Sequence, residues 1–260
     1  MTEMMFGSAP LNAYAFFEKY REHMAGDLAR TFDASGVRAF KEQSPEGKEV
    51  PATGAWVQLA RDQFKRDSVQ ILDRTFHVST RAAILSSQTE ERPTGSDLAI
   101  YFEVRGIPPH PFQLIKSKTL LVQAKCGEEN GVLLEFGDDR LLGQMNAIKA
   151  LTGGDGYLLV LTSTGAKCVT VAEAFKSIKG NRVRTANWRP SSDIFRNIAN
   201  CTAGNCSEIS PESLRATRLP SDEIDLDDAN RKLAELAKTK QLGTPFSPSH
   251  ALSLSLELRS

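Results

Sequence analysis

The chain lacks a net charge, because 32 lysines and arginines balance 32 aspartates and glutamates. It therefore cannot attract nucleic acid or an anionic membrane through its overall charge, and any such contact needs a local patch. No apolar run approaches the roughly 18 residues of a membrane span. No signal peptide is recognised either, so we expect a cytoplasmic protein that does not contact a membrane.

Cysteine and histidine are also scarce. The four cysteines contain no Cys-x-x-Cys pair, which favours reduced thiols over a disulfide framework or a zinc site. The four histidines are scattered along the chain: His23, His77, His110 and His250. Because no Ser/His/Asp arrangement accompanies them, nucleophilic catalysis of that type is not expected.

What the chain does have is a clear division of texture over its 260 residues. Helical spacing of apolar residues predicts helices over 11–32, 56–72 and 80–89, with a loop over 33–54. The first convincing strands come only after these helices. We therefore expect three parts: a helical segment 1–79 that packs on the core, an α/β core 80–200, and an extension 201–260 of helices and a terminal strand.

The core is predicted to be α/β, with a mixed central sheet flanked by helices. Residues 98–104 and 119–125 are β-rich, and the prolines between them cannot continue a strand. An antiparallel pair joined by a loop of about 12 residues is expected. A helix over 140–151, ended by Gly153-Gly154, then leads to a strand over 156–162 that is apolar throughout and therefore buried on both faces.

The extension carries a predicted helix over 228–242 and a final strand with strict alternation. Four leucines fall on one face of that strand: Leu252, Leu254, Leu256 and Leu258. We expect the strand to pair with an existing edge of the sheet. If it is exposed, it offers a surface for a homo-oligomer or a partner protein.

Polar residues at the start of one core strand and the end of the next point to chemistry. Gln123 and Lys125 share one face of their strand, and Asp97 opens the neighbouring strand. Glu91 precedes a Pro-Thr-Gly turn that can fold it back toward Asp97. Carboxylate and amide oxygens suit Mg²⁺ or Mn²⁺, and a lysine can orient a water and stabilise charge on a phosphate.

Asp97 followed by Gln123-Ala124-Lys125 resembles the PD-(D/E)xK nuclease superfamily, the restriction-endonuclease-like fold, in a variant with glutamine in place of the first acid. Glu91-x-x-Thr-Gly-x-Asp97 also resembles a form found in bacterial members. The resemblance implies Mg²⁺- or Mn²⁺-dependent hydrolysis of DNA phosphodiester bonds, in a restriction or antiphage defence setting. It implies Asp97, Gln123 and the Ala124 carbonyl as metal ligands, Lys125 at the attacking water, and Glu91 as a further ligand or water-positioning residue.

A basic stretch over 167–196 is the candidate nucleic-acid surface. Its proposed phosphate contacts are Lys176, Lys179, Arg182, Arg184 and Arg189. A solvated charged face is the alternative explanation for these residues.

Three interpretations of the whole chain remain open. The first is a metal-dependent deoxyribonuclease acting on DNA. The second is a catalytically inactive module of the same fold that binds nucleic acid or a partner protein. The third is an unrelated α/β protein in which Asp97 lies more than about 8 Å from Gln123 and Lys125, too far for one metal ion to join them.

Overall fold

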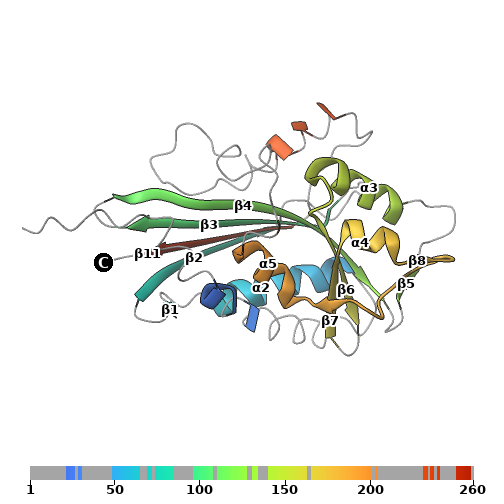
Figure 1. Ribbon diagram of the computed structural model, residues 1–260, viewed down its shortest axis with the longest axis horizontal. Coiled ribbons are helices and arrows are strands. Elements are labelled where there is room, and N and C mark those ends of the chain that lie inside the picture. Colours follow the sequence, from blue (N-terminus) through green and yellow to red (C-terminus); the bar gives the residue numbers. More distant parts are fainter. Residues whose placement is uncertain are drawn as a thin grey trace, which may run out of the picture.

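The structure is a computed structural model of the chain (Figure 1). It describes residues 22–26, 29–30, 49–64, 69–71, 74–84, 96–107, 110–127, 131–133, 140–162, 165–200, 203, 231–233, 235–236, 239–240 and 250–258. These residues form a large sheet, a small sheet and the helices around them. Among them, no helix is long and apolar enough to cross a membrane.

The large sheet has eight strands in the order β1-β2-β11-β3-β4-β6-β7-β10. Their bounds are β1 Val69–Ile71, β2 Arg74–Ile84, β3 Leu98–Ile107, β4 His110–Cys126, β6 Tyr157–Thr162, β7 Gly165–Thr170, β10 Arg189–Pro190 and β11 His250–Leu258. β3 runs antiparallel to β4, whereas β4 and β6 are parallel. The predicted class, α/β with a mixed sheet, is confirmed.

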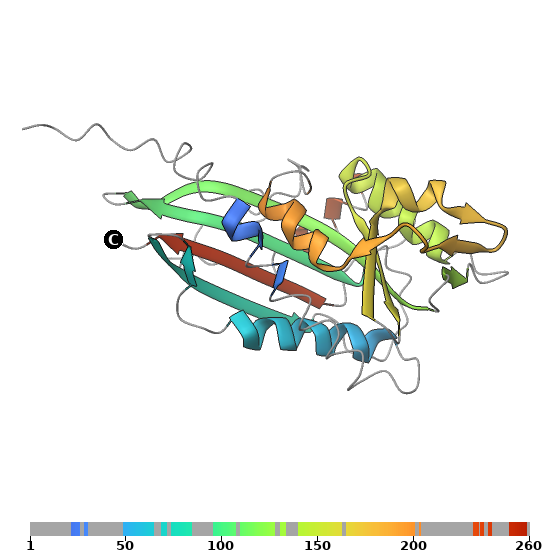
Figure 2. The same cartoon turned by 60° about the horizontal axis from the view of Figure 1, so that its bottom comes forward.

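Helices cover both faces of this sheet (Figures 1 and 2). Their bounds are α2 Glu49–Phe64, α3 Arg140–Thr152, α4 Val171–Lys176 and α5 Ser192–Ala199. On one face, Trp56 of α2 and Phe195 of α5 meet edge to face, with ring centroids 6.2 Å apart. On the other face, α3 and α4 pack through Met145, Ile148 and Val171.

A small sheet of three strands, in the order β5-β9-β8, lies beyond α4. Its strands are β5 Gly131–Leu133, β8 Ile178–Lys179 and β9 Arg182–Arg184. Val132 and Val183 are paired across β5 and β9 and are buried in the same apolar cluster as α3. The small sheet is thus fixed to the α3 side of the molecule.

Helix α3 and strand β6 confirm two predictions. Along α3, Leu141, Met145 and Ile148 are buried, as their three- and four-residue spacing requires. The helix ends at glycines whose φ angles are +69° and +106°, a region that glycine adopts without steric cost. All of β6 is buried, and its side chains alternate between the two cores, which explains its continuous apolar sequence.

The prediction of three helices before the first strand is wrong. Helix α2 begins at Glu49, inside the predicted loop, and ends at Phe64 rather than at residue 72. Residues 80–84, predicted to be helical, belong to β2, which pairs with β11 over nine residue pairs. Those long-range ladder bonds outweigh the weak helical preference of this segment. Within the predicted helix 11–32, the described residues 22–26 and 29–30 are helical.

The loop between β3 and β4 is also shorter than predicted. The ladder continues to a pair between Ile107 and His110, which leaves only Pro108 and Pro109 outside the strands. Two shifts of register after Val104 absorb the irregular Gly106 region. The prolines therefore sit at the tip, where no ladder donor is required.

The C-terminal strand is not an edge strand. β11 lies between β2 and β3, antiparallel to the first and parallel to the second. Leu252 and Leu254 are buried in the α2-side core, so these leucines serve packing rather than association. This overturns the expected exposed surface. The predicted boundary between residues 79 and 80 falls inside β2, and residues 231–233, 235–236 and 239 are helical within the predicted helix 228–242.

Candidate metal-dependent nuclease site

Asp97 and Gln123 face one another where the β3–β4 ladder begins. Leu98 pairs with Val122, and the Asp97 amide donates to the Val122 carbonyl at 3.0 Å, which sets Asp97 opposite Gln123. Ser96 is fully buried, and its hydroxyl hydrogen-bonds the carbonyls of Leu98 and Val122 at 2.9 and 3.0 Å. The turn that delivers Asp97 is therefore held by both strands.

The Asp97 carboxylate accepts two hydrogen bonds from β4. One comes from the Ala124 backbone amide, 2.8 Å from Oδ2, and the other from Nε2 of Gln123 to the same oxygen. Asp97 is buried, and a buried carboxylate requires such donors. The separation of Asp97 and Gln123 that the third interpretation required is absent.

Gln123 is fully buried on the α3 face of the sheet, beside Leu158 of β6 in register. Its Nε2 also donates to the Ala124 carbonyl at 3.1 Å. Its Oε1, although buried, has no hydrogen-bond partner among the described residues. Such an unsatisfied oxygen is uncommon in a folded protein and calls for an explanation.

Lys125 is half-buried at the next position along the same face of β4, in register with Val160. Asp97, Gln123 and Lys125 are thus gathered at one end of the β3–β4 pair, as predicted from strand alternation. Glu91 lies outside the described residues, so its predicted role stays a prediction.

A residue that the sequence did not single out also contacts Asp97. His250, at the start of β11, donates its backbone N–H to the Asp97 carbonyl at 2.9 Å. Its imidazole packs against α2 at Gly54, where an added Cβ would lie 2.9 Å from Nε2. Burial lowers the pKa of His250, while a hydrogen bond with the Asp97 backbone acts in the opposite direction. Only the pairing of β11 with β3 brings this residue here, and no local pattern reveals it.

The donors at this end of the sheet suit a hard divalent cation. They are an Asp97 carboxylate oxygen, the Gln123 amide oxygen and the Ala124 carbonyl, all of them oxygens. The orphaned Oε1 of Gln123 fits such a role. Among the described residues there is no cluster of three His, Cys, Asp or Glu side chains, because two of the three donors here are amide-type oxygens.

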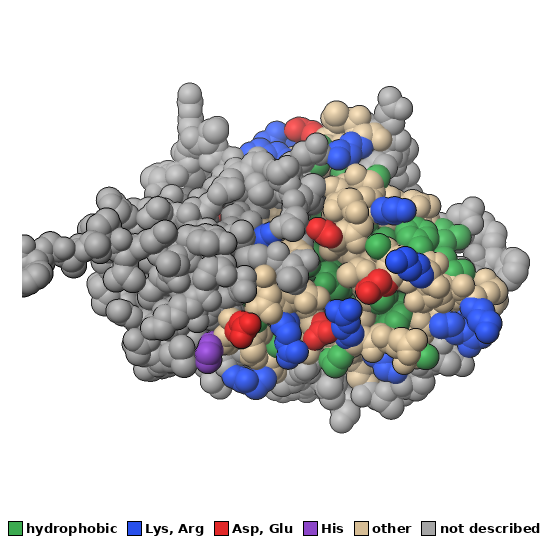
Figure 3. Space-filling view, viewed as in Figure 1, with side chains coloured by type: hydrophobic (Ala, Val, Ile, Leu, Met, Phe, Trp, Pro, Cys, Tyr) green, Lys and Arg blue, Asp and Glu red, His purple; other side chains and the backbone are tan. Residues whose placement is uncertain are grey.

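The basic residues of the candidate nucleic-acid surface divide into two groups. Lys179 and Arg182 form a pair across β8 and β9, and Arg184 lies on the same face of β9, opposite the buried Val183. Lys176 ends α4, just before β8. Figure 3 shows lysine and arginine side chains gathered at this end of the molecule.

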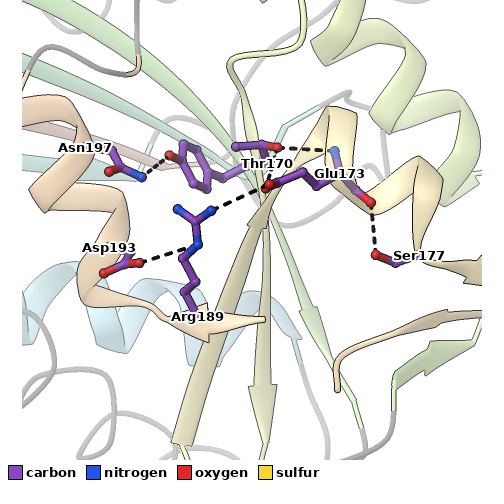
Figure 4. A network of polar contacts seen from close by, with 7 residues as sticks. Thr170, Glu173, Ser177, Arg189, Asp193 and Asn197 are labelled. Carbon is purple, nitrogen blue, oxygen red and sulfur yellow. Dashed lines mark hydrogen bonds and ion pairs between the residues drawn. The ribbon is translucent and has the colours of Figure 1, made fainter. Parts of the chain in front are cut away.

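Arg189 lies on the large sheet instead, on β10. Its guanidinium forms ion pairs with Glu173 at 3.6 Å and with Asp193 at 3.9 Å (Figure 4). Thr170 caps α4 by accepting from the Glu173 amide, which anchors the acid of this pair. Arg189 therefore joins β10 to α4 and α5, and its charge is already compensated.

Comparison of the chain with protein-family models, with curated proteins and with solved structures finds no match in any of the three. The function must therefore be inferred from the site itself.

Proposed function

We propose that the protein is a Mg²⁺-dependent endonuclease that hydrolyses DNA phosphodiester bonds. The observation that carries this proposal is the contact of Asp97 with Gln123 and Ala124 across the β3–β4 pair, with Lys125 next on the same face. The element order α2-β2-β3-β4-α3-β6 supports it, because it suits the restriction-endonuclease-like fold that these residues resemble.

Asp97, the amide oxygen of Gln123 and the Ala124 carbonyl would hold the cation, with Glu91 as a further ligand. When bound, Mg²⁺ would polarise the scissile phosphate and lower the pKa of a water. The Lys125 ammonium, half-buried beside these donors, would orient the attacking water and stabilise the charge that develops on phosphorus oxygens. A half-buried position strengthens that electrostatic effect relative to bulk water.

The small sheet would carry the DNA backbone past this site. β5 begins four residues after Gly127, and an added Cβ at Gly127 would lie 3.0 Å from Val132 of β5. The basic face of β8 and β9 therefore belongs to a sheet that packs at the Lys125 end of β4. Lys179 and Arg184 are exposed there and suit phosphate contacts. The family resemblance places such an enzyme in the cytoplasm, as a restriction or antiphage effector.

Plasmid nicking tests the proposal. The wild-type protein should convert supercoiled DNA to relaxed DNA in Mg²⁺ or Mn²⁺ and should be inactive in EDTA. Asp97→Ala and Lys125→Ala should each lower the rate by about a hundredfold or more. Lys149→Ala is the matched control, since this exposed lysine of α3 lies over the Phe175 ring, 5.4 Å from its centroid. Nicking that survives loss of Asp97 or Lys125 would refute the site.

A catalytically inactive module that binds nucleic acid or a partner protein is the second candidate. One observation favours it: Gln123 supplies an amide where a nuclease of this type commonly has a carboxylate, and that amide donates to Asp97. This candidate predicts a gel shift of DNA with no cleavage in Mg²⁺ or Mn²⁺. Cleavage by the wild type that Asp97→Ala abolishes would exclude it.

A further inference from the structure

The amide nitrogen of Gln123 lies between two oxygens that would otherwise face a cation. Nε2 donates both to Oδ2 of Asp97 and to the Ala124 carbonyl. These are two of the three oxygens assigned above to the metal. The third, Oε1 of Gln123 itself, is buried and has no partner among the described residues. The NH₂ group therefore occupies a place that suits positive charge, and the oxygen is left over.

We infer that the Gln123 amide is a two-position element that stands in for the divalent cation when the site is empty and turns over when the cation binds. The inference rests on the proposed function for the identity of the cation. With NH₂ directed inward, Asp97 and the Ala124 carbonyl are both satisfied by hydrogen bonds. With the oxygen directed inward, three acceptors would face one another and require a cation between them.

This arrangement explains why glutamine suits the position. A carboxylate at residue 123 would bind a cation more tightly through its charge. Without the cation, however, it would lie buried against the Asp97 carboxylate, with no NH₂ to donate to it. Glutamine thus lets the site assemble in the metal-free chain, and the affinity for the cation is lowered because the amide must first release two acceptors.

Thermal unfolding of the full chain with and without Mn²⁺ tests the inference. In EDTA, Gln123→Glu should melt at least about 5 °C below wild type, because two buried carboxylates then repel each other. In saturating Mn²⁺ it should recover, and its affinity for Mn²⁺ should be about tenfold or more above that of wild type. The matched control is Gln58→Glu on α2, where Gln58 accepts from Arg61 at 3.2 Å, and it should change neither quantity. Equal melting temperatures in EDTA and equal Mn²⁺ affinities would overturn the inference.

A second measurement uses the unaltered side chain. The NH₂ resonances of Gln123, assigned by their absence from Gln123→Met, should be protected from solvent exchange in EDTA. Mg²⁺ should shift them and remove that protection. Resonances that do not move at saturating Mg²⁺ would overturn the inference, even if Gln123→Glu fails to fold.

The outcome is separable from that of the proposed function. If the stability and resonance changes occur but no protein cleaves DNA, the metal-linked amide is supported and the nuclease activity is refuted. If the wild type cleaves DNA with the predicted dependence on Asp97, yet Gln123→Glu behaves as wild type in EDTA and in Mn²⁺, the nuclease survives and the two-position amide fails.

Discussion

Replacing Leu254 with alanine tests whether the C-terminal strand lies inside the sheet. Leu254 is fully buried, and its backbone pairs with Phe102 of β3 on one side and with Thr80 of β2 on the other. Removing a buried leucine side chain typically costs about 2–5 kcal/mol. For a chain of this size each kcal/mol lowers Tm by about 2–4 °C, so Leu254→Ala should melt about 5–15 °C below wild type.

Thermal unfolding followed by circular dichroism measures this effect. Leu142→Ala is the matched control, because Leu142 is only half-buried on α3 and should cost about 1 kcal/mol. If β11 were an appendage on an edge, the two variants would melt together. A fall in Tm for Leu254→Ala no larger than that for Leu142→Ala would refute its place between β2 and β3.

Three further predictions concern other parts of the molecule. Gly156→Ala should destabilise the fold by about 1–3 kcal/mol in urea titrations, since an added Cβ would lie 2.0 Å from Cγ2 of Ile148; wild-type stability would contradict the packing of α3. Burial raises the pKa of Tyr157 from 10.0 to about 12, so the folded state favours the neutral phenol and loses this stability as pH rises from 10 to 12. Tyr157→Phe, which also loses the 2.7 Å bond donated by Asn197, should be about 1 kcal/mol less stable at pH 8, and the gap should narrow by pH 11; a constant gap would refute the shift. Arg184→Ala should weaken DNA binding and reduce its salt dependence by about one unit of slope, whereas an unchanged slope would remove the small sheet from the interface.

The parts of the fold that sequence predicts are those whose partners lie nearby in the chain. Met145 and Ile148 follow the period of one helix, and the glycines after them end it. Asp97 and Gln123 belong to adjacent strands of a single hairpin, so alternation alone brings them to one face. The contact at the centre of the site is local in this sense.

The parts that sequence does not predict depend on distant pairing. β2 pairs with β11, whose residues follow it by more than 160 positions, from Phe76 with Leu258 to Ile84 with His250. Nothing in either segment identifies the other, so Thr80–Ile84 is mistaken for a helix and β11 for an edge strand. His250 reaches Asp97 by the same route.

The orientation of the Gln123 amide is likewise not readable from sequence. Glutamine offers both a donor and an acceptor, and strand alternation sets only the direction of the side chain. The choice depends on the Asp97 carboxylate and the Ala124 carbonyl converging on the same point. That convergence is a property of the folded β3–β4 pair.

The central claim is that Asp97, Gln123 and Ala124 hold a divalent cation in a nuclease site. Anomalous diffraction from crystals soaked in Mn²⁺ tests it most directly. The account predicts a peak bonded to a carboxylate oxygen of Asp97, to Oε1 of Gln123 and to the Ala124 carbonyl, at distances of about 2.1–2.2 Å. Crystals soaked at a Mn²⁺ concentration that supports DNA cleavage, with no peak among these three residues, would contradict it.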